Sequence, residues 1–214
     1  MMLSVLLKRP PSPQDRDNSA RLFYGTPAFA PDVLATFEAR FGVDVMIGFA
    51  MTETCYGTIE PLSGERRPFS CGVAREHPDP LFRNEIRIID AAGAPVPPDM
   101  AGEIVIRNPA ITPGYWANAE KTRESLRDGW LHTGDMARMD RDGYLYFVDR
   151  KKDIIRRRGE NISSQEIEAV LKRHPQILDA AVIGVPSELG DDDIKAYIVP
   201  MTDAKPDPAE IIGW

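Results

Sequence analysis

A short segment of the chain, residues 48–53 with the sequence GFAMTE, combines three groups that could handle a nucleotide. The ring of Phe49 can stack on a base, as aromatic rings do on any base face. The hydroxyl of Thr52 can donate to a phosphate, and the carboxylate of Glu53 is a hard oxygen ligand that suits Mg²⁺ beside phosphate oxygens. A polar loop that caps a strand and leaves Glu53 in water would have the same composition. The segment therefore predicts a nucleotide site only in company with other motifs.

Three further motifs follow this segment. They are GEI at residues 102–104 with GYW at 114–116, GWLHTGD at 129–135, and DRKKD at 149–153 with GENI at 159–162. The four motifs in this order resemble those of the AMP-binding, adenylate-forming superfamily, which includes acyl-CoA synthetases, peptide-synthetase adenylation domains and beetle luciferases. The resemblance extends over roughly residues 21 to 200. It implies ATP or AMP, Mg²⁺ and coenzyme A as cofactors and a small carboxylic acid as substrate.

The resemblance assigns roles to the residues of the first motif. It implies that Phe49, Ala50, Met51 and Thr52 contact the nucleotide, that Thr52 and Glu53 are catalytic, and that Glu53 binds the metal. The family commonly has glycine at the position of Ala50, where the backbone borders the acyl-carboxylate pocket. The extra methyl group is therefore expected to restrict the acyl group and to leave nucleotide binding unchanged.

Asp135 and Arg150 are implied to bind the sugar and phosphate. In the family, the carboxylate at the position of Asp135 accepts hydrogen bonds from both ribose hydroxyls, and two acceptor oxygens suit a vicinal diol. Arg150 resembles the arginine that meets the ribose and phosphate, where a planar guanidinium fork suits pairs of oxygens. The ordinary alternatives are a Gly-Asp turn without a ligand and an ion pair of Arg150 with Asp149 or Asp153. Trp130 is predicted to be a core residue that anchors the turn.

Two segments on either side of these residues also gain roles from the resemblance. Gly25, Thr26 and Pro27 resemble the family's turn beside adenine and the acyl pocket, although any turn between a strand and a helix has a similar composition. Lys152 aligns with the hinge on which the small C-terminal domain moves between two poses, one for adenylation and one for thioester formation. Gly159 resembles the glycine whose missing side chain lets pantetheine pass the backbone.

The basic run Arg156–Arg158 precedes that glycine and has two readings. One is a solvated charged strand or turn, and the other is an attraction for the phosphates of coenzyme A. The sequence does not decide between them.

The apolar pattern predicts the elements that position the motifs, in an α/β fold. Strands at residues 21–24 and 43–47 enclose a helix that begins near Pro31 and ends at Gly42, which makes a β-α-β unit. Beyond residue 84, alternating strands separated by Gly and Asp turns predict a small antiparallel barrel; these strands are residues 85–89, 102–107 and 144–148.

A different pattern begins after residue 150. Ser163 or Ser164 caps a helix that runs through Arg173, and strands at residues 177–185 and 194–199 follow. This predicts a partial α+β domain. The expected organisation is the C-terminal portion of a large AMP-binding domain in residues 1–149, divided into 1–83 and 84–149, and a hinge with a truncated mobile domain in residues 150–214.

Composition excludes several classes of protein. Hydrophobic residues make up 43% and charged residues 28% of the chain, which is typical of a globular protein. A net charge of −7 gives no basic field to attract nucleic acid. Cys55 and Cys71 form no disulfide framework, which favours a reducing compartment and hence the cytoplasm, and both are predicted to be buried. No apolar stretch approaches the length of a membrane span.

The sequence also lacks two parts that the resemblance implies. No Ser/Thr/Gly-rich phosphate loop and no lysine in the family's catalytic motif occur in the 214 residues. Both ends look interrupted, so the chain is expected to be an incomplete ATP-dependent carboxylic acid–CoA ligase that is inactive alone, with a homodimer possible for the whole protein. The alternatives are an adenylation domain that serves a carrier protein and a non-catalytic nucleotide-binding remnant.

Overall fold

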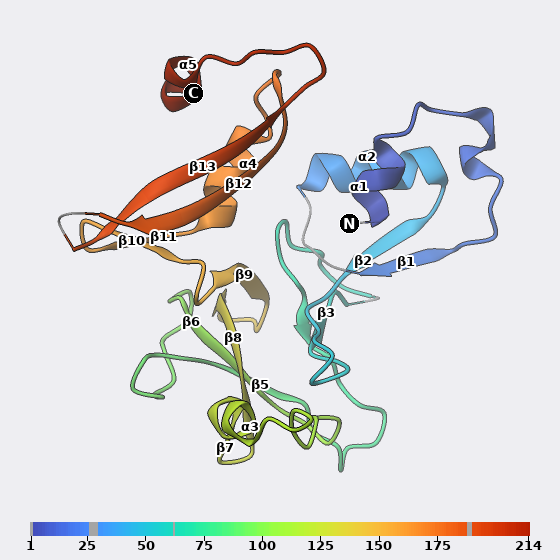
Figure 1. Cartoon of the computed structure of the whole chain (residues 1–214). Coiled ribbons are helices and arrows are strands. Elements are labelled where there is room, and N and C mark those ends of the chain that lie inside the picture. The colour runs from blue at the N-terminus through green and yellow to red at the C-terminus, as the bar shows by residue number, and fades with distance from the viewer. Residues whose placement is uncertain (1, 26–29, 62, 188–189) are drawn as a thin grey trace. The chain divides into compact units, whose positions relative to one another are not determined.

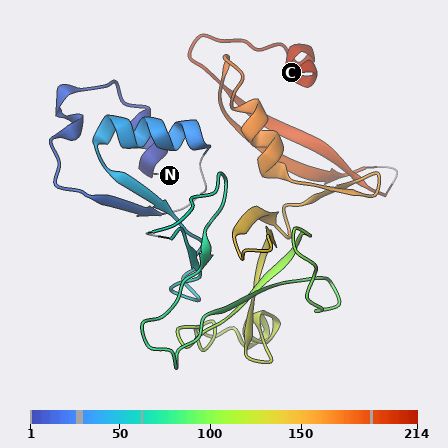
Figure 2. The same ribbon diagram turned by 180° about the vertical axis from the view of Figure 1, so that it is seen from behind.

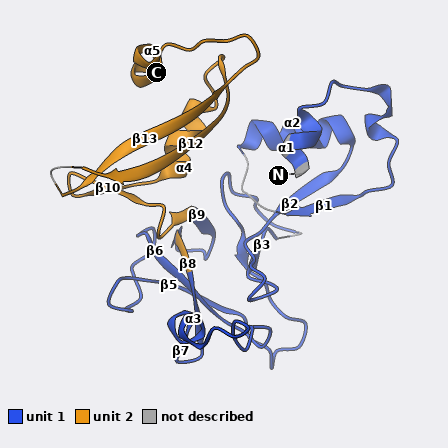
Figure 3. Cartoon of the chain, viewed as in Figure 1, with its two compact units in different colours: residues 1–133, 137–147 blue, residues 134–136, 148–214 orange. Residues whose placement is uncertain are grey.

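The computed structural model describes residues 2–25, 30–61, 63–187 and 190–214. These residues form two compact units, drawn in different colours in Figure 3. The first unit contains Met1–Thr133 and Ala137–Phe147, and the second contains Gly134–Met136 and Val148–Trp214. The predicted domain boundary between residues 149 and 150 stays a prediction.

The first unit begins with a β-α-β unit, as predicted. Strands β1 and β2 are parallel and place Gly25 beside Ile47. Helix α2 has Pro31 in its first turn and ends at Gly42, whose φ of 67° is the left-handed conformation that glycine adopts readily. Both views show α1 and α2 on the same side of the strand pair (Figures 1 and 2), and Phe37 of α2 is fully buried there. The elements are α1 Met2–Leu7, β1 Leu22–Gly25, α2 Pro31–Phe41 and β2 Asp44–Ile47.

The segment between α1 and β1 contains a turn of 3₁₀ helix, η1, at Pro13–Arg16. Ser12 and Asp15 form a capping box around its first turn. Oδ2 of Asp15 also accepts a hydrogen bond from Nε of Arg40 at 2.7 Å, which joins this segment to α2.

The antiparallel part of the first unit is a curled half-barrel of five strands. The strands lie in the order β5-β6-β8-β7, with β9 beside β8. Alternate residues such as Ile88, Ile104 and Ile106 point into the core that they share with β2 and α2. The elements are β3 Thr58–Ile59 and β4 Val73–Ala74, which pair with each other, and β5 Glu85–Ile89, β6 Gly102–Arg107, α3 Ala119–Ser125, β7 Leu126–Arg127, β8 Trp130–Met139 and β9 Leu145–Arg150.

Two predictions about this region are wrong. The segment around Asp135 is not a turn, because it lies within the ten residues of β8. Trp130 is not a core residue, because it is half-buried and lies beneath the guanidinium groups of Arg87 and Arg107, 4.4 Å and 4.6 Å from the ring centre. Cation–π contact with two arginines stabilises an indole at a partly wet position.

The second unit packs one helix against a two-stranded ribbon. Strands β12 and β13 are antiparallel, and α4 contributes Leu171 to a core with Ile155, Ile177 and Val182. Ser163 is the N-cap of α4, as predicted, but the helix ends at Leu171, two residues before Arg173. The elements are β10 Ile155–Arg157, β11 Glu160–Ile162, α4 Ser164–Leu171, β12 Ile177–Pro186, β13 Asp192–Pro200 and α5 Pro208–Gly213. In the described part of the chain, no helix is long and apolar enough to cross a membrane.

Candidate functional site

The first motif lies on a loop, residues 49–58, whose two ends are bonded together. The N–H of Phe49 donates to Oγ1 of Thr58 at 3.1 Å, and the N–H of Thr58 donates to the carbonyl of Phe49 at 2.9 Å. Oγ1 of Thr58 in turn donates to the carbonyl of Cys71. A Cβ atom at Gly48 or Gly57 would lie 2.5 Å from a backbone oxygen across this neck. Both positions therefore require glycine.

The other side of the 49–58 loop is held by two asparagines of the antiparallel sheet. Asn84, just before β5, donates to the carbonyl of Gly57 at 2.7 Å, and Asn108, just after β6, donates to the carbonyl of Tyr56 at 3.2 Å. Asn108 also donates to the side-chain oxygen of Asn84. The sheet therefore sets the position of a loop that follows β2.

Within the loop, a single helical turn separates buried from exposed side chains. The N–H groups of Thr54 and Cys55 both donate to the carbonyl of Met51, and Thr54 is fully buried. Ala50 and Thr52 are exposed. Cys55 is also exposed, so the prediction that it is buried is wrong. The turn accounts for this, because it places Thr54 inward and leaves Thr52 and Cys55 exposed.

Phe49 lies in the core at the neck of the loop. It is 7% exposed, and its ring packs beside that of Phe147 with 6.5 Å between the ring centres. The predicted contact of this ring with adenine stays a prediction.

Glu53 is half-buried and is held by the segment that carries the GYW motif. The hydroxyl of Tyr115 donates to its Oε1 at 3.0 Å, and the N–H of Thr112 donates to its backbone carbonyl at 2.8 Å. Burial, together with the bond to Glu53, raises the pKa of the Tyr115 hydroxyl, which keeps it a donor at neutral pH.

The surroundings of Glu53 fit a magnesium ion that is bound chiefly through phosphate. Among the described residues, no group of three or more His, Cys, Asp or Glu side chains could hold a metal ion. Mg²⁺ usually keeps several waters and takes one or two protein carboxylates together with substrate phosphates. The half-buried carboxylate of Glu53, with the exposed hydroxyl of Thr52 next to it in sequence, is therefore sufficient for such an ion.

Gly25 is the last residue of β1 and lies beside Ile47 of β2. The 49–58 loop begins two residues after Ile47. Because β1 and β2 are parallel, the segments that follow them leave the same edge of the strand pair. Thr26 and Pro27 lie outside the described residues.

In the second unit, the structure brings Asp135 and Arg150 together. Nε of Arg150, at the end of β9, lies 3.9 Å from Oδ1 of half-buried Asp135 on β8. The N–H of Lys151 donates to the carbonyl of Gly134 at 2.8 Å, which links the two strands beside the pair. Arg150 is 61% exposed, so this long ion pair contributes little to stability.

Asp149 caps helix α4. It is 1% exposed, and its Oδ2 accepts from the N–H and the hydroxyl of Ser164 at 2.7 Å and 2.8 Å and from the hydroxyl of Ser163 at 3.2 Å. A carboxylate suits this position because it meets unpaired N–H groups and the positive end of the helix dipole. The residue before Arg150 is thereby anchored.

The predicted hinge lies on an exposed turn. The N–H groups of Asp153 and Ile154 both donate to the carbonyl of Arg150. Lys152 lies within this turn and is exposed. Gly159 has a φ of 80°, a conformation that favours glycine, and a Cβ there would meet no atom of the described residues within 4 Å, its chain neighbours aside.

Three aspartates lie against the basic run Arg156–Arg158. The N–H groups of Arg156 and Arg158 donate to Asp192 and Asp191 at 2.9 Å and 2.8 Å, and Nη2 of Arg157 lies 3.5 Å from Asp193. Acidic side chains therefore offset part of the positive charge that the sequence displays at this point.

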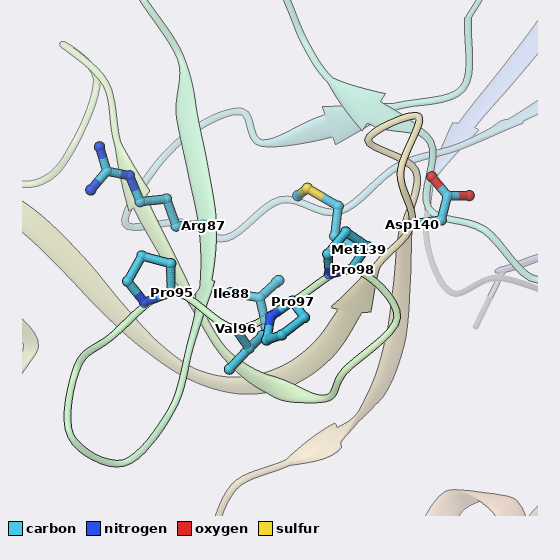
Figure 4. A pocket seen from close by; sticks show the side chains of 8 residues that line it. All are labelled: Arg87, Ile88, Pro95, Val96, Pro97, Pro98, Met139 and Asp140. Atoms are coloured by element: carbon cyan, nitrogen blue, oxygen red, sulfur yellow. The ribbon is translucent and has the colours of Figure 1, made fainter.

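The first unit has a hollow of about 200 Å³ away from these motifs, and Figure 4 shows the side chains that line it. Prolines and apolar side chains dominate it, and none of the predicted site residues lines it. Its lining residues are Arg87, Ile88, Pro95, Val96, Pro97, Pro98, Met139 and Asp140.

Comparison with known families matches residues 1–116 to "AMP-binding enzyme" and residues 166–214 to "AMP-binding enzyme C-terminal domain". The chain belongs to the AMP-binding enzyme family. Among curated members, it is 39% identical to a feruloyl-CoA synthase from Amycolatopsis sp over 186 residues, 86% of this chain and 37% of that one. It is 36% identical to the crotonobetaine/carnitine–CoA ligase of Proteus mirabilis over 205 residues, 93% of this chain and 38% of that one. The chain thus spans well under half the length of these relatives.

Solved structures of AMP-binding enzymes have the same fold. ATP-bound MatB from Rhodopseudomonas palustris superimposes with a TM-score of 0.77 and 31% identity, over 90% of this chain and 38% of that one. The anthranilate CoA ligase AuaEII in complex with anthranoyl-AMP gives a TM-score of 0.74 and 30% identity, over 90% of this chain and 36% of that one.

Several residues that hold the motifs were not predicted from the sequence. Asn84, Asn108 and Thr58 support the 49–58 loop, and Tyr115 binds Glu53. Of these, only Tyr115 carried a signal, because it lies in the GYW motif. The asparagines border strands, where polar residues are common and imply nothing particular.

Proposed function

We propose that the chain is part of an ATP-dependent carboxylic acid–CoA ligase. In this reaction, a carboxylate oxygen of the acid attacks the α-phosphorus of ATP, and pyrophosphate leaves. The sulfur of coenzyme A then attacks the acyl carbon, loses its proton, and AMP leaves. The observation that carries the proposal is the 49–58 loop, which presents Thr52 and Glu53 on a bonded frame in a chain that belongs to the AMP-binding enzyme family.

The residues of the first unit would bind and orient the nucleotide. The hydroxyl of Thr52 would donate to the α-phosphate, and Glu53 would hold Mg²⁺, which neutralises charge on the phosphates. The backbone around Ala50 and Met51 would border the nucleotide and the acid, and Phe49 would offer its ring to adenine. Gly25, at the end of β1, would border adenine, and the same role is proposed for Thr26 and Pro27. Such transfers depend on positioning and charge neutralisation, which explains why this set contains no nucleophile.

The residues of the second unit would bind the sugar and the thiol. Asp135 would accept from the two ribose hydroxyls, and Arg150, 3.9 Å away, would donate to oxygens of the ribose and phosphate. Lys152 would be the hinge, for which an exposed turn is suitable. Gly159, which lacks a side chain and takes a φ of 80°, would let pantetheine pass the backbone.

Coenzyme A is the proposed acceptor because two curated relatives are named for it, as feruloyl-CoA synthase and crotonobetaine/carnitine–CoA ligase. The acid would accordingly be a small or medium carboxylic acid, with aromatic and carnitine-like acids the first to try. The 214 residues are proposed to bind ATP without completing the reaction, because the sequence contains neither the phosphate loop nor the lysine that the family resemblance implies.

Equilibrium binding of ATP to the purified chain, with excess Mg²⁺, tests the nucleotide site. Glu53→Gln and Asp135→Asn are each expected to weaken binding at least tenfold, about 1.4 kcal/mol, since each removes a charged partner of the ligand. Glu76→Gln and Asp203→Asn change exposed carboxylates and serve as matched controls. Unchanged ATP affinity in both site variants would overturn the nucleotide site.

Product analysis tests the rest of the proposal. The chain is incubated with ATP, Mg²⁺, coenzyme A and a panel of acids, and acyl-CoA and AMP are sought by mass spectrometry. The 214 residues alone are expected to release neither product. Acid-dependent exchange of pyrophosphate into ATP by these residues would contradict the proposal that they are inactive alone.

A further inference from the structure

The contact between Tyr115 and Glu53 joins two motifs that lie 62 residues apart. The tyrosine holds the side chain of Glu53 through its hydroxyl, at 3.0 Å, and Thr112 holds the backbone of the same residue through its N–H, at 2.8 Å. One short segment therefore sets both the location of Glu53 and the direction of its carboxylate.

The segment that holds Glu53 is itself held by the first turn of α3. The N–H of Tyr115 donates to Oγ1 of Thr122 at 2.9 Å, and that hydroxyl donates to the carbonyl of Asn118 at 2.8 Å. Gly114 has a φ of 149°, and a Cβ there would lie 2.7 Å from Cγ2 of Thr122. These contacts leave Tyr115 little freedom of position.

The Tyr115 bond is not needed to close the 49–58 loop. The paired bonds between Phe49 and Thr58 close its neck, and buried Thr54 anchors its helical turn. What the Tyr115 hydroxyl adds is the orientation of one carboxylate, because the side chain of Glu53 is only half-buried and would otherwise rotate. A hydroxyl bound to one oxygen of a carboxylate is also the arrangement by which outer partners orient the ligands of a metal.

We infer that Tyr115 is a positioning residue, whose hydroxyl holds the Glu53 carboxylate ready for the metal ion of a bound nucleotide. This inference rests on the proposed function, since it gives Tyr115 a task only if Glu53 meets Mg²⁺. A positioning role for Tyr115 differs from a purely structural role in one measurable respect. A structural tether affects ATP binding with and without metal alike, whereas a positioning residue affects the gain in ATP affinity that Mg²⁺ provides.

The test measures ATP affinity by calorimetry on the purified chain, once with excess Mg²⁺ and once with excess EDTA. The ratio of the two dissociation constants is the metal gain. Tyr115→Phe is expected to lower the metal gain about tenfold, the usual smallest effect of removing a partner that orients a metal ligand, and to leave ATP affinity in EDTA within twofold.

Tyr146→Phe is the matched control. Tyr146 is also half-buried, its hydroxyl donates to the carboxylate of Asp140 at 3.2 Å, and burial likewise raises its pKa. Its substitution removes the same chemical group from the first unit and is expected to leave the metal gain unchanged. Glu53→Asp provides a second route, because the shorter side chain retracts the carboxylate from Tyr115. It is expected to lower the metal gain, with no further loss when Tyr115→Phe is added.

The outcomes distinguish a failure of the role of Tyr115 from a failure of the proposed function. A wild-type metal gain that Glu53→Gln abolishes and Tyr115→Phe leaves intact would overturn the role of Tyr115 and keep the proposed function. A wild-type chain without ATP binding, or without any metal gain, would overturn both. Equal weakening by Tyr115→Phe in Mg²⁺ and in EDTA would make the tyrosine a structural tether and would also refute the inference.

Discussion

The two segments that carry the candidate site are supported in different ways. The 49–58 loop is bonded to residues from distant parts of the sequence, namely Cys71 at its neck, Asn84 and Asn108 on one side and Tyr115 at Glu53. The segment from Asp149 to Gly159 has long-range bonds at its two ends and at the N–H of Lys151. Its turn between Arg150 and Ile154 is closed by bonds among neighbours in sequence.

This difference is consistent with the roles proposed for the loop and for the hinge. Residues that meet the reacting phosphates need positions accurate to a fraction of an ångström, which many non-local contacts provide. A hinge must instead absorb changes in φ and ψ, so it is better placed on an exposed turn with local bonds. Substitutions in the loop are therefore expected to change stability, and substitutions in the turn are expected to change stability little.

The largest expected effect is that of Thr58→Val at the neck of the loop. It leaves the N–H of Phe49 and the carbonyl of Cys71 without their partner in the core. An unpaired buried group costs about 1–3 kcal/mol, so the free energy of unfolding should fall by about 3 kcal/mol in urea denaturation. Thr36→Val, which removes an exposed hydroxyl on α2, should change it by less than about 0.5 kcal/mol. A small loss in Thr58→Val would mean that the neck is not the loop's main support.

Asp149→Asn should have the next largest effect. The amide keeps only one acceptor oxygen, although the carboxylate accepts from Ser163, Ser164 and the N–H of Arg150. We expect a loss of about 2 kcal/mol in the unfolding of the second unit. Asp153→Asn on the exposed turn is the control and should be close to neutral. If the two variants were equally stable, the turn would have no anchor at Asp149.

Asp135→Asn should act on binding, with a smaller free-energy change. The variant should bind ATP about tenfold more weakly, about 1.4 kcal/mol, and by the same factor in Mg²⁺ and in EDTA, because its proposed partner is the ribose. Glu53→Gln, in contrast, should weaken binding chiefly in Mg²⁺. Calorimetry in the two buffers distinguishes them, and the same metal dependence for both variants would place Asp135 at the phosphates.

Lys152→Ala should have the smallest effect. The side chain is exposed on a turn whose bonds are made by the backbone, so stability should change by less than about 0.5 kcal/mol and ATP affinity by less than twofold. A loss above 1 kcal/mol would show that Lys152 supports the fold, and the comparison between loop and turn would then be wrong.

Local patterns predicted most of the elements, because their signals lie within a few residues. Pro31 and Gly42 mark the ends of α2, and Ser163 caps α4. The segment around Asp135 was predicted as a turn because Gly-Asp is common in turns. In the structure, Gly134 takes a φ of 72° inside β8, and pairing with neighbouring strands decides the outcome.

The support of the site could not be predicted from the sequence. The motifs named Thr52 and Glu53, but the contacts of Tyr115 and Asn108 with the loop join residues 52 or more positions apart. The exposure of Cys55 follows from the helical turn of the loop, which buries Thr54 and leaves Cys55 on the outside. Such contacts depend on tertiary packing, for which a single sequence has no local signal.

The central claim is that the 49–58 loop, which bears Thr52 and Glu53, binds ATP together with Mg²⁺. Hydrogen exchange of the chain, followed by mass spectrometry over a series of ATP concentrations with Mg²⁺, tests it most directly. Peptides covering residues 49–58 are expected to become protected, with a half-saturating ATP concentration that rises at least tenfold in Glu53→Gln. The absence of protection at saturating ATP, or the same half-saturating concentration in Glu53→Gln, would contradict this claim.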